Sequence, residues 1–327
     1  MDLSERDQEL LQRLLAGDRR ALSRAITLAE NNPWDSRALI DALYRQQLLG
    51  RAEVIGITGP PGAGKSTLTG YLIKHLRSKG KTVGVVLIDP SSPFTGGALL
   101  GDRVRMSDST TDPGVFIRSM GSRGHLGGLS SATQDAVSLM DAFGMDTILI
   151  ETVGIGQAET EIVQTADSTV VVCVPGLGDE IQIIKAGIME IGDVFVVNKA
   201  DRDGAEKVVI EINMMLDMAP AGANDRPPVI KTVANRDKGL DDLVLALETR
   251  GEQIRQNGML TKRRRNRLWK AINDSMQQQL MMSLRPVAEH EGQEAIFERI
   301  EAGASSPFVE AQLLLELVGS GGKASSR

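Results

Sequence analysis

Residues 59–67 read G-P-P-G-A-G-K-S-T and combine the residue types that hold phosphate. The run follows an apolar segment, V-I-G-I-T, and precedes a helical pattern, which is the setting in which GxxxxGK[ST] forms a phosphate loop. Glycines let backbone N–H groups converge on phosphate oxygens, and a helix N-terminus favours negative charge. We expect Lys65 to reach the β- and γ-phosphates and Ser66 to offer its hydroxyl to Mg²⁺. The predicted phosphate contacts are Gly59, Pro60, Pro61, Gly62, Ala63, Gly64, Lys65, Ser66 and Thr67.

A second motif, N-K-A-D at residues 198–201, predicts which nucleotide base is bound. The carboxylate of Asp201 can accept hydrogen bonds from N1–H and the 2-amino group of guanine, while the stem of Lys199 covers the ring. Adenine lacks that pair of donors and would leave a buried carboxylate unpaired. Asn198 and its neighbours could instead cap a helix, but their place at a strand end after a phosphate loop favours guanine. The later strand end predicts a base loop at Val233, Ala234 and Asn235.

Three of the acidic residues between these motifs are candidates for a metal site. Asp89 and Glu151 each end an apolar run, and Asp102 lies in the long segment after Asp89. Ligands bind beyond the carboxyl ends of parallel strands, so we expect these carboxylates to hold Mg²⁺, directly or through water, together with Ser66. Either aspartate could instead cap a helix or form a turn. Glu151 stands where aspartate is usual in GTP-binding domains, and it could also position the attacking water.

Bulk composition limits the alternatives. The chain has 327 residues and a net charge of −6, which gives no general field for holding nucleic acid. Cys173 is the only cysteine, so no intrachain disulfide can form and a reducing cytoplasm is expected. No stretch has the roughly 18 apolar residues of a membrane span, and we expect a soluble, unprocessed protein. The basic run at 261–270 is interpreted as a solvated helix face or a contact for an acidic protein.

Apolar, β-branched runs alternate with amphipathic segments between residues 54 and 247. Continuous apolarity indicates strands covered on both faces, so we predict an α/β P-loop domain with a mostly parallel sheet, residues 50–250. Three helical patterns precede it in residues 1–49, where Ser4 is the expected cap of the first. Helical patterns at about 262–284, 287–302 and 307–318 predict a C-terminal helical arm, residues 251–319, followed by a disordered tail at 320–327.

Seven segments together resemble the MeaB/ArgK family of GTPases over residues 1 to about 320: G-P-P-G-A-G-K-S-T, V-L-I-D-P-S-S, G-D-R-V-R-M, H-L-G-G-L, E-T-V-G-I-G-Q-A-E, P-G-L-G-D-E-I-Q-I-I-K and V-V-N-K-A-D. The resemblance implies a homodimeric, Mg²⁺-dependent GTPase that binds GTP and GDP, with residues 251–319 as its dimerisation arm. It implies a chaperone that gates adenosylcobalamin loading and protects a cobalamin-dependent acyl-CoA mutase, such as methylmalonyl-CoA mutase. The family's metal and hydrolysis positions fall on Ser66, Asp89, Asp102 and Glu151. Its partner-sensing loop falls on residues 176–185, which would bring Lys185 to the phosphates.

Slow hydrolysis by the isolated protein is expected, because no glutamine directly follows the strand that ends near Glu151; Gln157 comes later. Lys65, Glu151 and Lys185 are the catalytic candidates, although Lys185 could equally be an exposed helix residue. Three other functions remain open: a kinase or ATPase linked to amino-acid transport, a nickel-type metallochaperone GTPase, and a protein-targeting GTPase. N-K-A-D disfavours ATP. The histidines are scattered, which disfavours a nickel metallochaperone. The sequence has no pattern of a Met-rich RNA-binding domain, which disfavours a protein-targeting GTPase.

Overall fold

The structure is a computed structural model that describes residues 3–31, 33–89, 111–121, 128–152, 162, 164–176, 192–218 and 226–321. Residues 33–35, 89, 128–130, 285–291 and 318–321 are described by their backbone alone. The chain divides into two compact units, Met1–Arg267 and Leu268–Arg327. Asp102 and Lys185 lie outside the described residues, as do residues 177–184 of the predicted partner-sensing loop.

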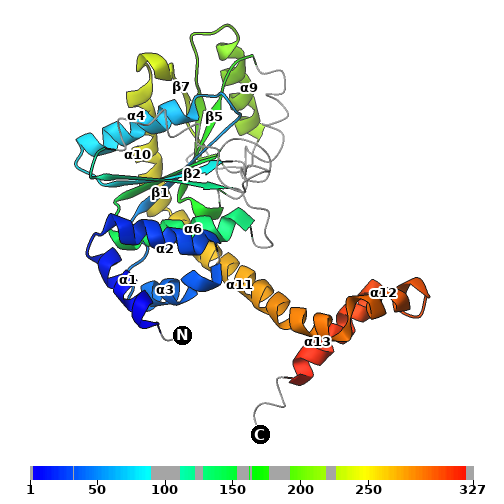
Figure 1. Ribbon diagram of the computed structural model, residues 1–327. Helices are drawn as coiled ribbons and strands as arrows, with labels where there is room; N and C mark the ends of the chain where they lie inside the picture. The colour runs from blue at the N-terminus through cyan, green and yellow to red at the C-terminus, as the bar shows by residue number, and fades with distance from the viewer. Residues whose placement is uncertain are drawn as a thin grey trace. The chain divides into compact units, whose positions relative to one another are not determined.

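A parallel sheet of seven strands forms the centre of the first unit (Figure 1). Its order is β3-β2-β4-β1-β5-β6-β7, and all six strand pairings are parallel. This confirms the predicted α/β fold. The strands are β1 (Glu53–Thr58), β2 (Val83–Asp89), β3 (Val115–Gly121), β4 (Thr147–Thr152), β5 (Ser168–Cys173), β6 (Val194–Val197) and β7 (Val229–Lys231).

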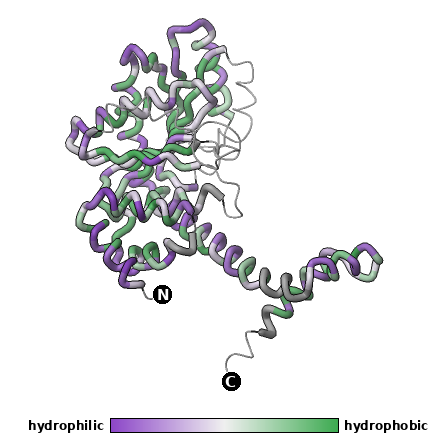
Figure 2. Tube along the Cα trace, viewed as in Figure 1, coloured by the Kyte–Doolittle hydropathy of each residue, from purple (hydrophilic) through white to green (hydrophobic). Residues whose placement is uncertain are grey.

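Helices cover both faces of this sheet, which explains why its strands are apolar along their whole length. Neighbouring residues of β1 belong to different cores: Val54 packs with one helical layer and Ile55 with the other. Figure 2 shows the strands as the most consistently hydrophobic part of the unit. One face is covered by α4 (Lys65–Ser78) and α10 (Leu240–Gln256), and the other by α6 (Gly128–Phe143) and α9 (Ala205–Met218).

The N-terminal helices α1 (Glu5–Leu15), α2 (Arg19–Asn31) and α3 (Pro33–Arg45) share one hydrophobic core with α6 and the sheet. Ser4 caps α1 as predicted, its Oγ accepting from the Asp7 N–H at 3.2 Å. Residues 4–49 are therefore packed as part of the first unit rather than as a separate body.

Three helices follow the sheet domain: α11 (Met259–Glu291), α12 (Gln293–Glu301) and α13 (Pro307–Gly321). The expected start of a new helix at 287 is wrong, because α11 continues through Pro286 and the break falls at Gly292, whose φ is +79°. A proline removes a single N–H donor, whereas a residue in the left-handed region cannot continue a helix. The predicted tail overlaps α13 at residues 320–321. Within the described residues, no helix combines the length and apolar composition that crossing a membrane requires.

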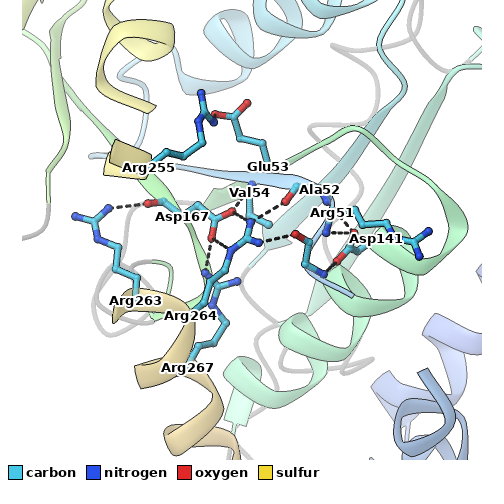
Figure 3. Close-up of polar contacts among 11 residues, drawn as sticks. Arg51, Ala52, Glu53, Val54, Asp141, Asp167, Arg255, Arg263, Arg264 and Arg267 are labelled. Atoms are coloured by element: carbon cyan, nitrogen blue, oxygen red, sulfur yellow. Dashed lines mark hydrogen bonds and ion pairs between the residues drawn. The ribbon is translucent and has the colours of Figure 1, made fainter. Parts of the chain in front are cut away.

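The first turns of α11 are fixed to the amino edge of the sheet by ion pairs (Figure 3). Arg264 and Arg267 both bind the carboxylate of Asp167, directly before β5, each at 2.8 Å. Arg263 binds Asp193, directly before β6, through two hydrogen bonds of 2.7 and 2.9 Å. This edge is opposite to the one at which the predicted site residues follow the strands.

Candidate nucleotide-binding site

The phosphate loop, residues 59–67, connects β1 to α4 at the carboxyl edge of the sheet. Its shape depends on glycine at two positions. A Cβ on Gly59, whose φ is +142°, would lie 2.1 Å from the carbonyl oxygen of Val172, and one on Gly64, with φ +90°, would lie 2.3 Å from the Asn198 amide nitrogen. Only glycine fits so close to its neighbours in these conformations. The loop therefore presses against both β5 and the residue that follows β6.

Lys65 is buried within the phosphate loop. Its ammonium group donates to the carbonyl oxygens of Gly59 at 2.7 Å and Pro60 at 3.0 Å. The side chain is thus folded back along the phosphate loop. The Lys199 ammonium donates to the carbonyl of Gly62 at 2.7 Å, so a second cation contacts the same loop from the base-recognition motif.

Glu151 lies in β4, between β1 and β2, and its side chain is buried. Two hydroxyls from α4 donate to its carboxylate, Ser66 to Oε1 and Thr69 to Oε2, each at 2.6 Å. A hydroxyl and a carboxylate are both ligands that suit Mg²⁺, which needs one or two carboxylates from a protein beside substrate phosphates and water. The predicted pair Ser66 and Glu151 is therefore brought together with a donor set that fits the ion.

Asn198 joins the base-recognition motif to the phosphate loop. Its amide nitrogen donates to the carbonyl of Ala63 at 2.7 Å. Its amide oxygen accepts from the Thr232 hydroxyl at 3.0 Å and the Ala234 N–H at 3.1 Å. One buried side chain thus sets the distance between the phosphate loop and the base loop, residues 233–235.

Asp201 lies on the surface at the same edge of the sheet. Its carboxylate faces the guanidinium of Arg236 at 3.5 Å, and both side chains are more than one-third exposed. A pair of this kind is weak, so the carboxylate can exchange its partner for guanine donors. Lys199 has a φ of +57°, a left-handed conformation that turns the chain sharply between Asn198 and Asp201.

Comparison with known families places this site in context. The family described as methylmalonyl-CoA mutase-associated GTPase MeaB matches residues 22–288, which include the phosphate loop, Glu151 and the base-recognition motif. The chain belongs to the MeaB family. It is accordingly a GTPase and binds guanine nucleotide, and the resemblance seen in its motifs is confirmed.

Relatives span most of this MeaB-family GTPase. A Pyrococcus abyssi protein named as a GTPase is 47% identical over 317 residues, 96% of this chain and 97% of the relative. The mouse mitochondrial protein named methylmalonic aciduria type A homolog is 32% identical, covering 96% and 81% of the two chains. The crystal structure of LAO/AO transport system kinase has the same fold, with a TM-score of 0.67 and 24% identity over 98% of this chain and 100% of that one.

In this GTPase the strand order gathers most predicted residues at one edge. Asp89 ends β2, which pairs directly with β4. Its side chain is not described, and Asp102 and Lys185 are outside the described residues, so their roles stay predictions. Sequence reasoning missed Thr69, Thr232 and Arg236. Thr69 had a signal, since it lies three residues after Ser66 on the same helix face. The contacts of Thr232 and Arg236 depend on how strands β6 and β7 pair.

Proposed function

We propose that this GTPase is a chaperone for an adenosylcobalamin-dependent acyl-CoA mutase, methylmalonyl-CoA mutase or a relative. The observation that carries the proposal is the match to a family described as mutase-associated across residues 22–288. In the proposed cycle, GTP binding and hydrolysis gate cofactor loading and protect the mutase. We place the protein in the cytoplasm, where its single buried cysteine needs no disulfide partner.

The proposed nucleotide site uses backbone N–H groups of the phosphate loop and the Lys65 ammonium for the phosphates. A phosphate is a charged partner, and it can attract Lys65 more strongly than the neutral carbonyls of Gly59 and Pro60 do. Asp201 and Lys199 would hold guanine, while residues Val233, Ala234 and Asn235 would form the base loop.

Mg²⁺ is the proposed metal, held by Ser66 with Asp89, Asp102 and Glu151 as further ligands or as acceptors for its waters. Support comes from the hydrogen bond between Ser66 and Glu151, which places a hydroxyl beside a buried carboxylate. When bound, the ion would neutralise charge on the β- and γ-phosphates. Glu151 would fix the Ser66 hydroxyl and accept hydrogen bonds from water near the γ-phosphate.

The second unit is proposed to form a homodimer. Its helices carry exposed large apolar side chains, including Trp269, Met276 and Phe308, the last 86% exposed. Trp269, Ile272, Met276 and Leu280 recur at three- and four-residue spacing along α11, and a contiguous exposed apolar face of this kind marks a surface that another chain covers. Sedimentation of the intact protein tests this, and a monomer at micromolar concentration would contradict it.

Mixing the protein with purified methylmalonyl-CoA mutase tests the chaperone proposal. We expect GTP hydrolysis to be slow alone and to rise at least ten-fold with the mutase, because a partner can complete an unfinished site. Lys185→Ala should abolish the stimulation and leave the unstimulated rate unchanged. Lys207→Ala, which removes an exposed lysine of α9, is the matched control and should retain stimulation. Failure of any cobalamin-dependent mutase to bind or stimulate, or hydrolysis of ATP in preference to GTP, would contradict the proposal.

A further inference from the structure

Both oxygens of the Glu151 carboxylate are held by side chains of one helix. Ser66 was expected in the site from its motif, whereas Thr69 belongs to no motif. The two hydroxyls are three residues apart on α4 and therefore point from neighbouring positions on the same helix face. Thr69 is fully buried, so water does not compete for its hydroxyl. Its 2.6 Å contact with Oε2 is as short as the contact of Ser66 with Oε1.

The Thr69 hydroxyl has one proton and two acceptors within reach. Its oxygen lies 3.0 Å from the carbonyl oxygen of Lys65 and 2.6 Å from Glu151. A distance of about 2.6 Å is characteristic of an O–H donor on an ionised carboxylate, which is the stronger of the two bonds. The Thr69 hydroxyl therefore donates its hydrogen bond to Glu151, and the Lys65 carbonyl is the alternative acceptor when the carboxylate moves away.

The length of the Glu151 side chain explains why a second hydrogen bond to its carboxylate is needed. Glutamate has one more rotatable bond than aspartate, and an unheld side chain would spread its carboxylate over several rotamers. Two hydroxyls from a rigid helix select one position. A shorter aspartate at 151 would set its carboxylate about 1.5 Å, one carbon–carbon bond, nearer the strand. An aspartate carboxylate could not reach both hydroxyls in the same way, so the hydrogen bond from Thr69 depends on glutamate at position 151.

We propose that Thr69 is a positioning residue for Glu151. It holds Oε2 so that Oε1 stays available to the Ser66 hydroxyl. A hydroxyl that donates its proton to a carboxylate keeps its oxygen lone pairs for a cation. Thr69 thus acts on Mg²⁺ binding and on hydrolysis through Glu151, without contacting nucleotide or metal. The inference rests on the proposed metal site.

The test compares Thr69→Val, which keeps the shape and removes the hydroxyl, with Thr69→Ser, which keeps the hydroxyl. Three quantities are measured on the full-length protein: GTP turnover, the Mg²⁺ concentration that half-maximally slows release of a fluorescent GDP analogue, and release in EDTA. For Thr69→Val we expect turnover to fall about ten-fold and the half-effective Mg²⁺ concentration to rise several-fold, with release in EDTA unchanged. Thr69→Ser should remain within about three-fold of the parent in all three.

Thr133→Val is the matched control for loss of a buried hydroxyl. Thr133 is buried in α6, and its Oγ1 has no hydrogen-bond partner among the described residues. All three quantities should match the parent. Parent-like values for Thr69→Val would overturn the inference, as would an equal loss in Thr69→Ser, which would assign the effect to packing. If the parent itself showed no Mg²⁺ dependence, the proposed metal site would fail instead.

Discussion

The side-chain amide of Asn198 donates to the main-chain carbonyl of Ala63 at 2.7 Å, across 135 positions of the chain. The same amide accepts from Thr232 and from the N–H of Ala234. A single side chain therefore fixes the spacing between the part of the site that meets phosphate and the part that meets the base.

Asn198→Ala should weaken GTP binding at least ten-fold. The substitution leaves buried groups of both loops without a partner, a cost of about 1 to 3 kcal/mol for each unsatisfied group. Fluorescence titration with a labelled GDP gives the affinity. Asn213→Ala on α9, away from the site, is the control and should bind like the parent; equal affinities for the two variants would contradict the bridging role.

Asp201→Asn should exchange guanine for xanthine as the preferred base. Xanthine has an oxygen in place of the 2-amino group of guanine, so it needs a donor where guanine needs an acceptor, and the asparagine amide supplies one. GTP affinity should fall at least ten-fold while XTP affinity rises, by competition against labelled GDP. The neighbouring Asp203→Asn should keep the parent's preference, and a GTP preference retained by Asp201→Asn would remove Asp201 from base recognition.

Glu151→Gln should keep GTP affinity within a few-fold and lose hydrolysis by about two orders of magnitude. The amide retains one acceptor oxygen, but it presents N–H donors to the second hydroxyl of the pair Ser66 and Thr69. Phosphate release under single-turnover conditions separates chemistry from binding. Glu206→Gln, in an exposed pair with Lys231, should hydrolyse at the parent's rate. Unchanged turnover in Glu151→Gln would refute the assigned role.

Asp167→Ala should destabilise the first unit by about 3 to 5 kcal/mol, because it leaves the guanidinium groups of Arg264 and Arg267 without their shared carboxylate. Burial by itself would raise the pKa of Asp167, but hydrogen bonds and charge from Arg264 and Arg267 outweigh it and hold the pKa below its ordinary value. The contribution is thus present at neutral pH and is lost as the pH falls through that lowered pKa.

Urea unfolding at pH 7 measures the effect of Asp167→Ala. The matched control is Asp217→Ala, which breaks an exposed ion pair with Arg226 and should cost less than about 1 kcal/mol. Similar losses in the two variants would show that the buried cluster contributes no more than a surface pair.

Asp135→Asn should stabilise the protein at pH 8 and leave it little changed at pH 4. Burial raises the pKa of this α6 carboxyl from 3.8 to about 7, against the opposing effects of the Ser36 hydroxyl and Arg37 on α3. Well below its ordinary pKa of 3.8 the group is neutral in folded and unfolded chains, and its contribution is fully present. As the pH rises the unfolded chain ionises first, so stability falls until the folded carboxyl ionises near pH 7.

The difference in unfolding free energy between Asp135→Asn and the parent should therefore grow with pH, by on the order of 2 to 4 kcal/mol between pH 4 and 8. Thermal or urea unfolding across this range measures it. A difference that does not change with pH would contradict the raised pKa.

Local sequence patterns predicted those features of this protein that depend only on residues close together in the chain. The phosphate loop is continuous in sequence, and its glycines, lysine and serine need only a strand before them and a helix after them. Strand positions followed from apolar runs in the same way, since a strand covered on both faces has no polar side. The break in the C-terminal helices was misplaced because one proline is tolerated in α11 while Gly292 adopts a positive φ.

Only the tertiary structure decided how distant residues meet. The order β2-β4-β1 brings Glu151 against α4, where Thr69 holds its second oxygen, and the pairing of β6 with β7 brings Thr232 and Ala234 to Asn198. Such contacts depend on strand order and register, which short motifs do not encode because the contacting residues are separated by tens of positions in the chain. The sequence by itself determined that the protein binds a nucleotide and which residue types do so. The packing of helices on the sheet determined which other side chains hold those residues in place.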